Sequence, residues 1–88
     1  MRVTVQLFAR LREIAGTDEW TCEAAPGASV ADVWRAVSAA HPGLAEFSAA
    51  VSAALNEEFT PMSARVTDGD SVAFLPPVSG GAARDVEP

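Results

Sequence analysis

The amino-terminal part of the chain opens on two stretches in which apolar and polar side chains alternate. Val3, Val5 and Leu7 are separated by single polar residues, which is the period-2 pattern of a strand with one buried face. The same alternation returns in residues 20–24, just before a Pro-Gly turn. We therefore expect two strands linked as a hairpin, with Cys22 pointing inward.

A short helical turn is predicted between these strands. Leu11 and Ile14 lie three residues apart within residues 9–15, the spacing of one helix face. Gly16 follows and can end the turn by adopting a positive φ.

A longer amphipathic helix is predicted after the second strand. Ser29 and Asp32 have the spacing of a capping box at its start, and residues 41–43, His-Pro-Gly, mark its end. Apolar positions recur at i, i+3, i+4 and i+7, as expected for one buried stripe. They are Val30, Val33, Trp34 and Val37.

The pattern is weaker in the second half of the chain. Alanine and serine in residues 44–54 suit either a helical turn or a strand, so we place a strand only at 51–55. Residues 56–67 contain turn formers and Pro61 and are predicted to form a loop.

The last strand is predicted more firmly. An Asp-Gly-Asp turn at residues 68–70 leads into an apolar run at 71–75. Val72 and Phe74 share one face of that strand, and Leu75 lies on the other.

These elements predict an α+β fold of the ubiquitin-like β-grasp type, a mixed sheet with one main helix packed on one face. The first and last strands can then lie side by side at the sheet centre. We expect this domain to span residues 1–75. Pro76 and Pro77 end the sheet because proline cannot donate to a ladder. Residues 76–81 are then an extended functional tail, and residues 82–88 a flexible extension.

Composition limits the partners of the chain. The 88 residues are 49% hydrophobic, enough for one modest core but too few to line a catalytic cavity on all sides. Six arginines, no lysine and 12 acidic residues give a net charge of −6. That charge opposes binding to nucleic acid and favours a protein partner with a basic face.

The cysteine count and the hydropathy profile indicate the cellular compartment of the protein. Cys22 is the only cysteine, which excludes an intrachain disulfide and fits a small core residue in a reducing compartment. No apolar run reaches the roughly 20 residues that span a bilayer, and the amino terminus lacks a signal-peptide pattern. We therefore expect a cytoplasmic protein without a membrane partner.

Other polar residues are interpreted structurally. His41 precedes a proline at a helix end, where its charge suits the helix dipole better than base catalysis. Asp68 and Asp70 form a turn and lack the further ligands of a cation site, so no metal is expected. Glu57 and Glu58 are interpreted as a solvated loop edge.

Three segments carry a resemblance to a known family. Residues 68–81, DGDSVAFLPPVSGG, and residues 8–16, FARLREIAG, together with Leu-Asn-Glu at 55–57, resemble the MoaD/ThiS family of ubiquitin-like sulfur carriers. The likeness is greatest to its MoaD branch, the small subunits of molybdopterin synthase, and it extends over residues 1–81. A Gly-Gly pair alone would suit a flexible linker equally well, but the combined motif favours the family.

The resemblance implies a reaction at the tail. The carboxylate of Gly81, preceded by Gly80, is adenylated with ATP by an E1-like activating enzyme and converted to a thiocarboxylate by a persulfide sulfurtransferase. The tail then enters the large subunit of molybdopterin synthase, where its sulfur is placed on a cyclic pyranopterin precursor in molybdenum cofactor biosynthesis. The chain itself is then a non-catalytic sulfur donor that binds no cofactor.

The resemblance also implies a docking surface. Strand parity places Phe8 and Leu75 on the side opposite Leu7 and Phe74, so the helix-covered core cannot bury them all. The partner-binding residues of the family correspond here to Phe8, Phe59, Leu75, Pro76, Pro77, Val78 and Ser79.

The sequence departs from the family after its glycine pair. Residues 82–88, AARDVEP, follow Gly81, so that Gly81 carries an amide, which cannot be adenylated. A protease exposes Gly81, or the extra residues are an appended segment, or the chemistry has been lost. Two alternative functions remain open: a sulfur carrier for thiamine, cysteine or another thio-metabolite, and a ubiquitin-like module that only docks on or modifies proteins.

Overall fold

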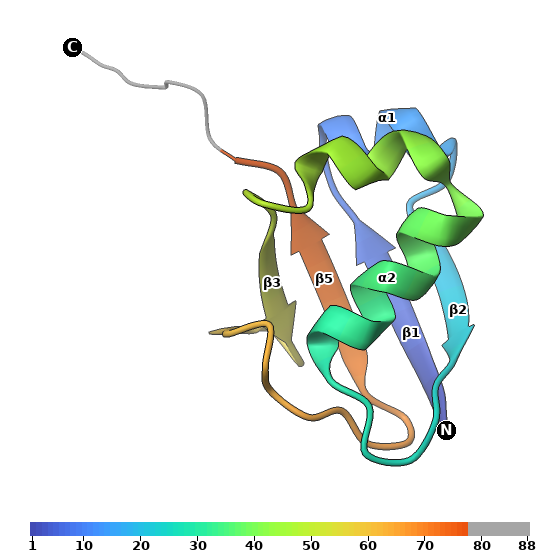
Figure 1. Ribbon diagram of the computed structural model, residues 1–88, viewed down its shortest axis with the longest axis vertical. Coiled ribbons are helices and arrows are strands. Elements are labelled where there is room, and N and C mark those ends of the chain that lie inside the picture. The colour runs from blue at the N-terminus through green and yellow to red at the C-terminus, as the bar shows by residue number, and fades with distance from the viewer. Residues whose placement is uncertain (78–88) are drawn as a thin grey trace, which may run out of the picture.

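The chain forms a five-stranded mixed sheet with its helices on one side (Figure 1). The computed structural model describes residues 1–77. The strands are β1 (Arg2–Leu7), β2 (Glu19–Glu23), β3 (Ser52–Leu55), β4 (Glu58–Thr60) and β5 (Ser71–Leu75). The helices are α1 (Arg10–Ala15), α2 (Val30–Ala40) and the 3₁₀ helix η1 (Pro42–Phe47).

The sheet order is β2-β1-β5-β3-β4, which confirms the predicted β-grasp fold. β1 and β5 pair in parallel near the centre, with Val5 opposite Val72 and Leu7 opposite Phe74. β2 pairs with β1, and β3 with both β5 and β4, all antiparallel. The predicted neighbourhood of the first and last strands is therefore confirmed.

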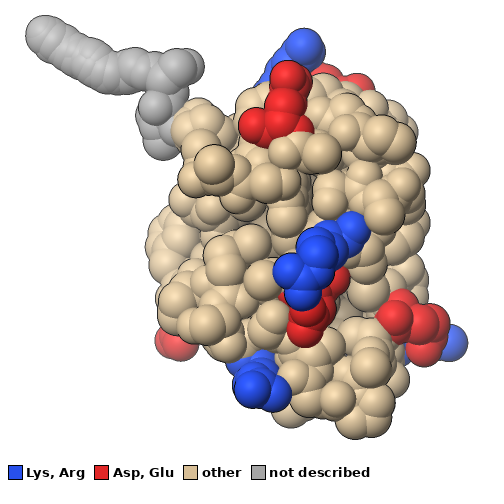
Figure 2. All heavy atoms as spheres, in the orientation of Figure 1, with Lys and Arg blue, Asp and Glu red and all other residues tan. Residues whose placement is uncertain are grey.

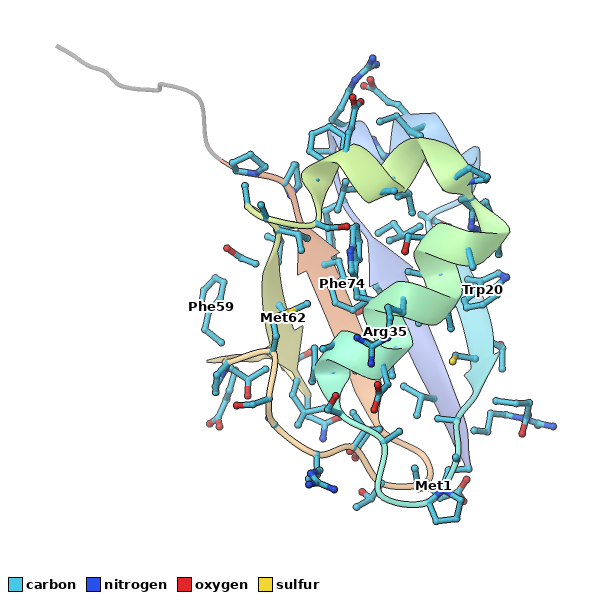
Figure 3. The ribbon with its side chains drawn as sticks, viewed as in Figure 1. Met1, Trp20, Arg35, Phe59, Met62 and Phe74 are labelled. Carbon is cyan, nitrogen blue, oxygen red and sulfur yellow. The ribbon has the colours of Figure 1, made fainter. Side chains whose placement is uncertain are left out.

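The core lies between the sheet and α2. Phe74 is fully buried there, and its ring meets Trp34 edge to face at a centroid distance of 5.0 Å. Figure 3 shows Phe74 beneath the helix layer. Trp34 satisfies its indole N–H by donating to Ser48 Oγ at 2.9 Å, which ties α2 to the segment after η1.

Cys22 belongs to this core, and its inward orientation is confirmed. Its side chain is 2% exposed, and burial raises the pKa of the thiol. A buried, protonated thiol is a poor nucleophile. Its role is that of a small apolar side chain under α2.

The helix ends follow the predicted local chemistry. The Ser29 hydroxyl accepts from the Asp32 N–H at 3.2 Å, while the Asp32 carboxylate accepts from the Ser29 N–H at 2.9 Å, a complete capping box. The Ser29 N–H lowers the pKa of Asp32. Gly16 ends α1 with a φ of 77°, as expected.

The prediction for residues 56–67 was wrong in one respect. This stretch contains β4, a three-residue edge strand that pairs with β3, so the order is not simply strand, strand, helix, strand, strand. Three residues are too short for a period-2 pattern, and β4 depends on its partner rather than on its own sequence. Pro42–Phe47 is a 3₁₀ helix, and β3 begins at Ser52 rather than Val51.

The Asp-Gly-Asp segment is a turn that joins three parts of the chain. Asp68 Oδ1 accepts from the backbone N–H of Arg2, and Asp70 Oδ2 accepts from that of Thr67, both at 2.7 Å. Asp70 Oδ1 also accepts from the Asn56 amide at 3.1 Å. Both carboxylates therefore accept hydrogen bonds from backbone N–H groups and fix the path of the chain.

No helix within residues 1–77 is long and apolar enough to cross a membrane.

Asp70 makes the stability of the fold depend on acidity. The Thr67 N–H, with a smaller contribution from Asn56, lowers the pKa of Asp70 below its usual value of 3.8. A carboxylate with a lowered folded-state pKa stabilises the fold above its unfolded-state pKa, and this contribution is lost as the pH falls below that value. We expect Asp70→Asn to be less stable at neutral pH and to lose less further stability between about pH 5 and pH 3. Urea unfolding at both pH values tests this, with Glu46→Gln as the control for losing one charge. If the free energy of unfolding of Asp70→Asn fell as steeply between these pH values as that of the wild type, the prediction would be contradicted.

Candidate functional site

The face of the sheet opposite α2, here called the open face, carries a row of side chains across four strands. Gln6 on β1 lies opposite Ala73 on β5, Ala73 lies opposite Ala54 on β3, and Ala54 lies opposite Phe59 on β4. Directly opposed residues project to the same side of a sheet. The two alanines thus form a low floor between larger neighbours.

This floor belongs to a hollow of about 410 Å³ on the open face. The hollow is bounded by residues of β1, β3, β4 and β5, by the residue that follows β1, and by the turn between β3 and β4. They are Gln6, Phe8, Ala54, Glu57, Phe59, Ser71, Ala73 and Leu75. The structure therefore brings together Phe8, Phe59 and Leu75, the three partner-binding residues that the sequence predicts within the folded domain.

Two of these side chains are exposed to an unusual degree. Phe8 is 44% and Phe59 79% exposed, and they are the exposed large apolar side chains of residues 1–77. Figure 3 shows the Phe59 ring standing clear of the sheet. Covering a phenylalanine side chain yields about 1.5–3 kcal/mol, so a partner that fills this hollow would gain substantially. An apolar patch of this kind is typical of a protein interaction site.

Phe8 is held at the end of β1 by backbone contacts on both sides. Its N–H donates to the carbonyl of Phe74 on β5 at 3.3 Å, and its own carbonyl accepts from the Leu11 N–H at 3.1 Å. Ala9 follows with a φ of 54°, a conformation that favours glycine. The ring thus comes from a turn rather than from a freely moving loop.

The far side of the hollow is fixed by Asn56, a role that the sequence reading missed. The Asn56 N–H donates to the Ser71 carbonyl at 2.8 Å, and Asn56 Oδ1 accepts from the Ser71 N–H at 3.0 Å. With its bond to Asp70, the side chain fastens the β3–β4 turn to the start of β5. The available signal was the Leu-Asn-Glu match to the family.

The tail leaves the sheet beside the hollow. Leu75 lines the hollow, half-buried Pro76 follows it directly, and Pro77 is exposed. Neither proline belongs to β5, which agrees with the predicted end of the sheet. The remaining predicted site residues, Val78, Ser79, Gly80 and Gly81, lie outside the described residues.

Three exposed arginines form ion pairs with carboxylates, and Figure 2 shows red and blue neighbours on the helix-covered face. The pairs are Arg2 with Glu23, Arg10 with Glu13, and Arg35 with Asp32. Exposed pairs of this kind contribute little to stability.

The chain matches known proteins along most of its length. Residues 5–81 match the ThiS family, a match that ends at the second glycine of the tail. The molybdopterin synthase sulfur carrier subunit of Chlamydomonas reinhardtii is 40% identical over 83 residues, which cover 92% of this chain and 100% of the relative.

Solved structures agree with the fold. Small archaeal modifier protein 1 of Haloferax volcanii superposes with a TM-score of 0.80 at 30% identity, covering 92% of this chain and 100% of that one. A chain from the complex of subunits 1 and 2 of the molybdopterin-converting factor of Helicobacter pylori gives 0.64 at 27% identity, covering 92% and 100%. The chain therefore belongs to the ThiS/MoaD family of ubiquitin-like sulfur carriers, as its motifs predicted.

Proposed function

We propose that this chain is the sulfur-donor subunit of a molybdopterin synthase. The tail carries the sulfur, and the folded domain is the part that partners recognise. Catalysis belongs to those partners, since the short folded domain has too few residues to enclose a pterin substrate on all sides. The relatives named as molybdopterin synthase sulfur carrier subunits support this function over its alternatives.

The observation that carries the proposal is the position of the apolar hollow beside the exit of the tail. Leu75 lines the hollow and Pro76 begins the tail, so a protein that covers the hollow is placed next to the arm. Six residues from Pro76 to Gly81 span roughly 20 Å when extended. Docking on the domain therefore delivers the arm to a site about that far inside the partner.

The chemistry needs three partners. The Gly81 carboxylate displaces pyrophosphate from ATP on an E1-like enzyme, giving a mixed anhydride with AMP, because a free carboxylate resists nucleophilic attack. The terminal sulfur of a protein persulfide then displaces AMP, and a thiol reduces the resulting acyl disulfide to the thiocarboxylate. In the large synthase subunit the sulfur passes to a cyclic pyranopterin, and water returns the tail to its carboxylate.

The composition of the tail suits this use. Glycine at positions 80 and 81 lets the backbone pass a channel too narrow for a Cβ and adopt whatever φ the partner requires. Pro76 and Pro77 restrict the arm before insertion and so reduce the entropy lost on binding. The domain needs no cofactor of its own, because ATP is used by the activating enzyme.

A second candidate function is protein modification. The likeness to small archaeal modifier protein 1, at a TM-score of 0.80, raises this function, but a putative molybdopterin converting factor subunit 1 of Pyrococcus furiosus superposes about as well, at 0.79, so the fold does not decide between the two. Both functions begin with activation of Gly81. They differ in the acceptor, a sulfur-accepting metabolite in one case and an amine on another protein in the other.

Activation should depend on where the chain ends. A chain terminating at Gly81, incubated with ATP, the E1-like enzyme and a persulfide donor, should gain about 16 Da as one oxygen is replaced by sulfur. The full 88-residue chain should gain nothing, because its Gly81 carbonyl is an amide. Intact-mass spectrometry measures both, and a chain ending in Gly81→Ala is the control. No adduct on the trimmed chain would contradict a sulfur carrier.

Docking should depend on Phe59 while folding should not. Because Phe59 is 79% exposed, Phe59→Ala should change the free energy of unfolding by no more than about 0.5 kcal/mol. If it is an interface anchor, its loss should weaken binding to the large synthase subunit by about thirtyfold, as for a hot spot of 2 kcal/mol. Phe59→Leu should retain most of the affinity. Calorimetric titration and thermal unfolding separate the two effects, and unchanged affinity in Phe59→Ala would exclude this surface.

A further inference from the structure

Backbone strain gathers around the hollow. Among residues 1–77, the non-glycine residues with positive φ are Ala9 at 54°, Asn56 at 49° and Glu57 at 74°. Ala9 follows Phe8, while Asn56 and Glu57 form the β3–β4 turn at the opposite side of the hollow. Left-handed backbone costs most residues about 1–2 kcal/mol, and such strain concentrates at functional sites.

Glu57 occupies a position in this group where the turn itself would favour another residue. A two-residue hairpin turn with positive φ at both positions favours Asn followed by Gly. Asn56 meets that preference and gains three hydrogen bonds to β5 and the preceding turn. Glu57 occupies the glycine position, and within the described residues its carboxylate makes no hydrogen bond or ion pair.

The carboxylate stands at a distinctive place. Glu57 is the one charged residue among the eight that line the hollow. Its neighbours there are two phenylalanines, a leucine, two alanines, a glutamine and a serine. A partner that covers this surface therefore meets an apolar depression with a single negative charge at its rim.

We propose that Glu57 is a specificity-determining docking residue, which pairs with an arginine or lysine that the partner protein carries beside an apolar side chain seated in the hollow. The inference rests on the proposed function, because it assumes that the hollow is the docking surface. A charge at the rim of an interface acts mainly on the association rate and on the rejection of wrong partners. A glycine would suit the turn better but would leave the rim of the hollow without a charge.

Glu58 provides a matched control on the neighbouring residue. It lies opposite Leu55, whereas Phe59 lies opposite Ala54, so Glu58 projects to the other face of the sheet. Glu58→Gln changes the net charge by the same one unit as Glu57→Gln. Any difference between the association rates of the two variants then arises from the position of Glu57 at the hollow and not from the change in net charge.

The experiment measures association of the chain with the large synthase subunit of the same organism, by stopped-flow fluorescence at low and high salt. Glu57→Gln and Glu57→Gly should slow association at low salt about threefold, the effect of losing one rim ion pair, and should flatten its salt dependence. Glu58→Gln should behave as wild type. Glu57→Gly should also raise Tm by about 4 °C because it relieves the turn, so the variant would be more stable and yet dock more slowly.

The outcomes separate the two proposals. If the wild-type chain does not bind the large subunit, the proposed function fails. If the wild type binds and Glu57→Gln associates as fast as Glu58→Gln, the docking surface stands and the role of Glu57 is overturned. Glu57→Gln keeps the turn backbone and a side chain of equal length, so its result does not depend on how Glu57→Gly folds. A lower Tm in Glu57→Gly would overturn the argument from strain.

Discussion

The parallel pairing of β1 with β5 is the constraint on which the rest of the structure depends. Parallel strands that pair in register end at the same edge of a sheet, so the chain leaves β1 at Phe8 and β5 at Pro76 side by side. The Phe8 N–H extends the ladder by one more bond, to the Phe74 carbonyl. One end of the sheet thereby brings together an exposed aromatic ring, a leucine and the start of the tail, although 67 residues of chain separate the ends of the two strands.

The same pairing divides β5 between two tasks. Val72 and Phe74 face α2 and are fully buried, while Ala73 and Leu75 face the hollow. Because side chains alternate strictly along a strand, the core can be packed tightly on one face while the residue types on the open face remain free to vary. The alanines at 54 and 73 keep the open face low at its middle, so that an apolar side chain from a partner can be seated there.

The sequence predicted those parts of the molecule that depend on local patterns. The alternation of Val3, Val5 and Leu7, the capping box at Ser29 and the parity of β5 each follow from residues close together in the chain, and each agrees with the structure. The fold class followed from their order. Strand parity also indicated that the core cannot bury both Phe8 and Leu75, so an apolar surface on the open face could be predicted.

The missed features depend on partners distant in sequence. β4 has three residues and no periodicity of its own, and it exists because β3 offers an edge to pair with. The role of Asn56 depends on Ser71, fifteen residues later. Glu57 was interpreted as a solvated loop edge, and only its positive φ and its place at the hollow distinguish it from any other exposed glutamate.

The distribution of amines bears on how an activated tail would behave. An acyl adenylate reacts with any accessible amine, so a carrier with lysines near its own arm would lose activated groups to itself. The 88 residues contain no lysine. The amino group of Met1 donates to the Ala24 carbonyl at 2.9 Å where β1 begins, whereas the tail leaves β5 at the opposite end of the sheet (Figure 1). Arginine supplies the positive charges, and its guanidinium stays protonated and unreactive at neutral pH. The surface is therefore one on which an activated glycine meets amines mainly when a partner presents them.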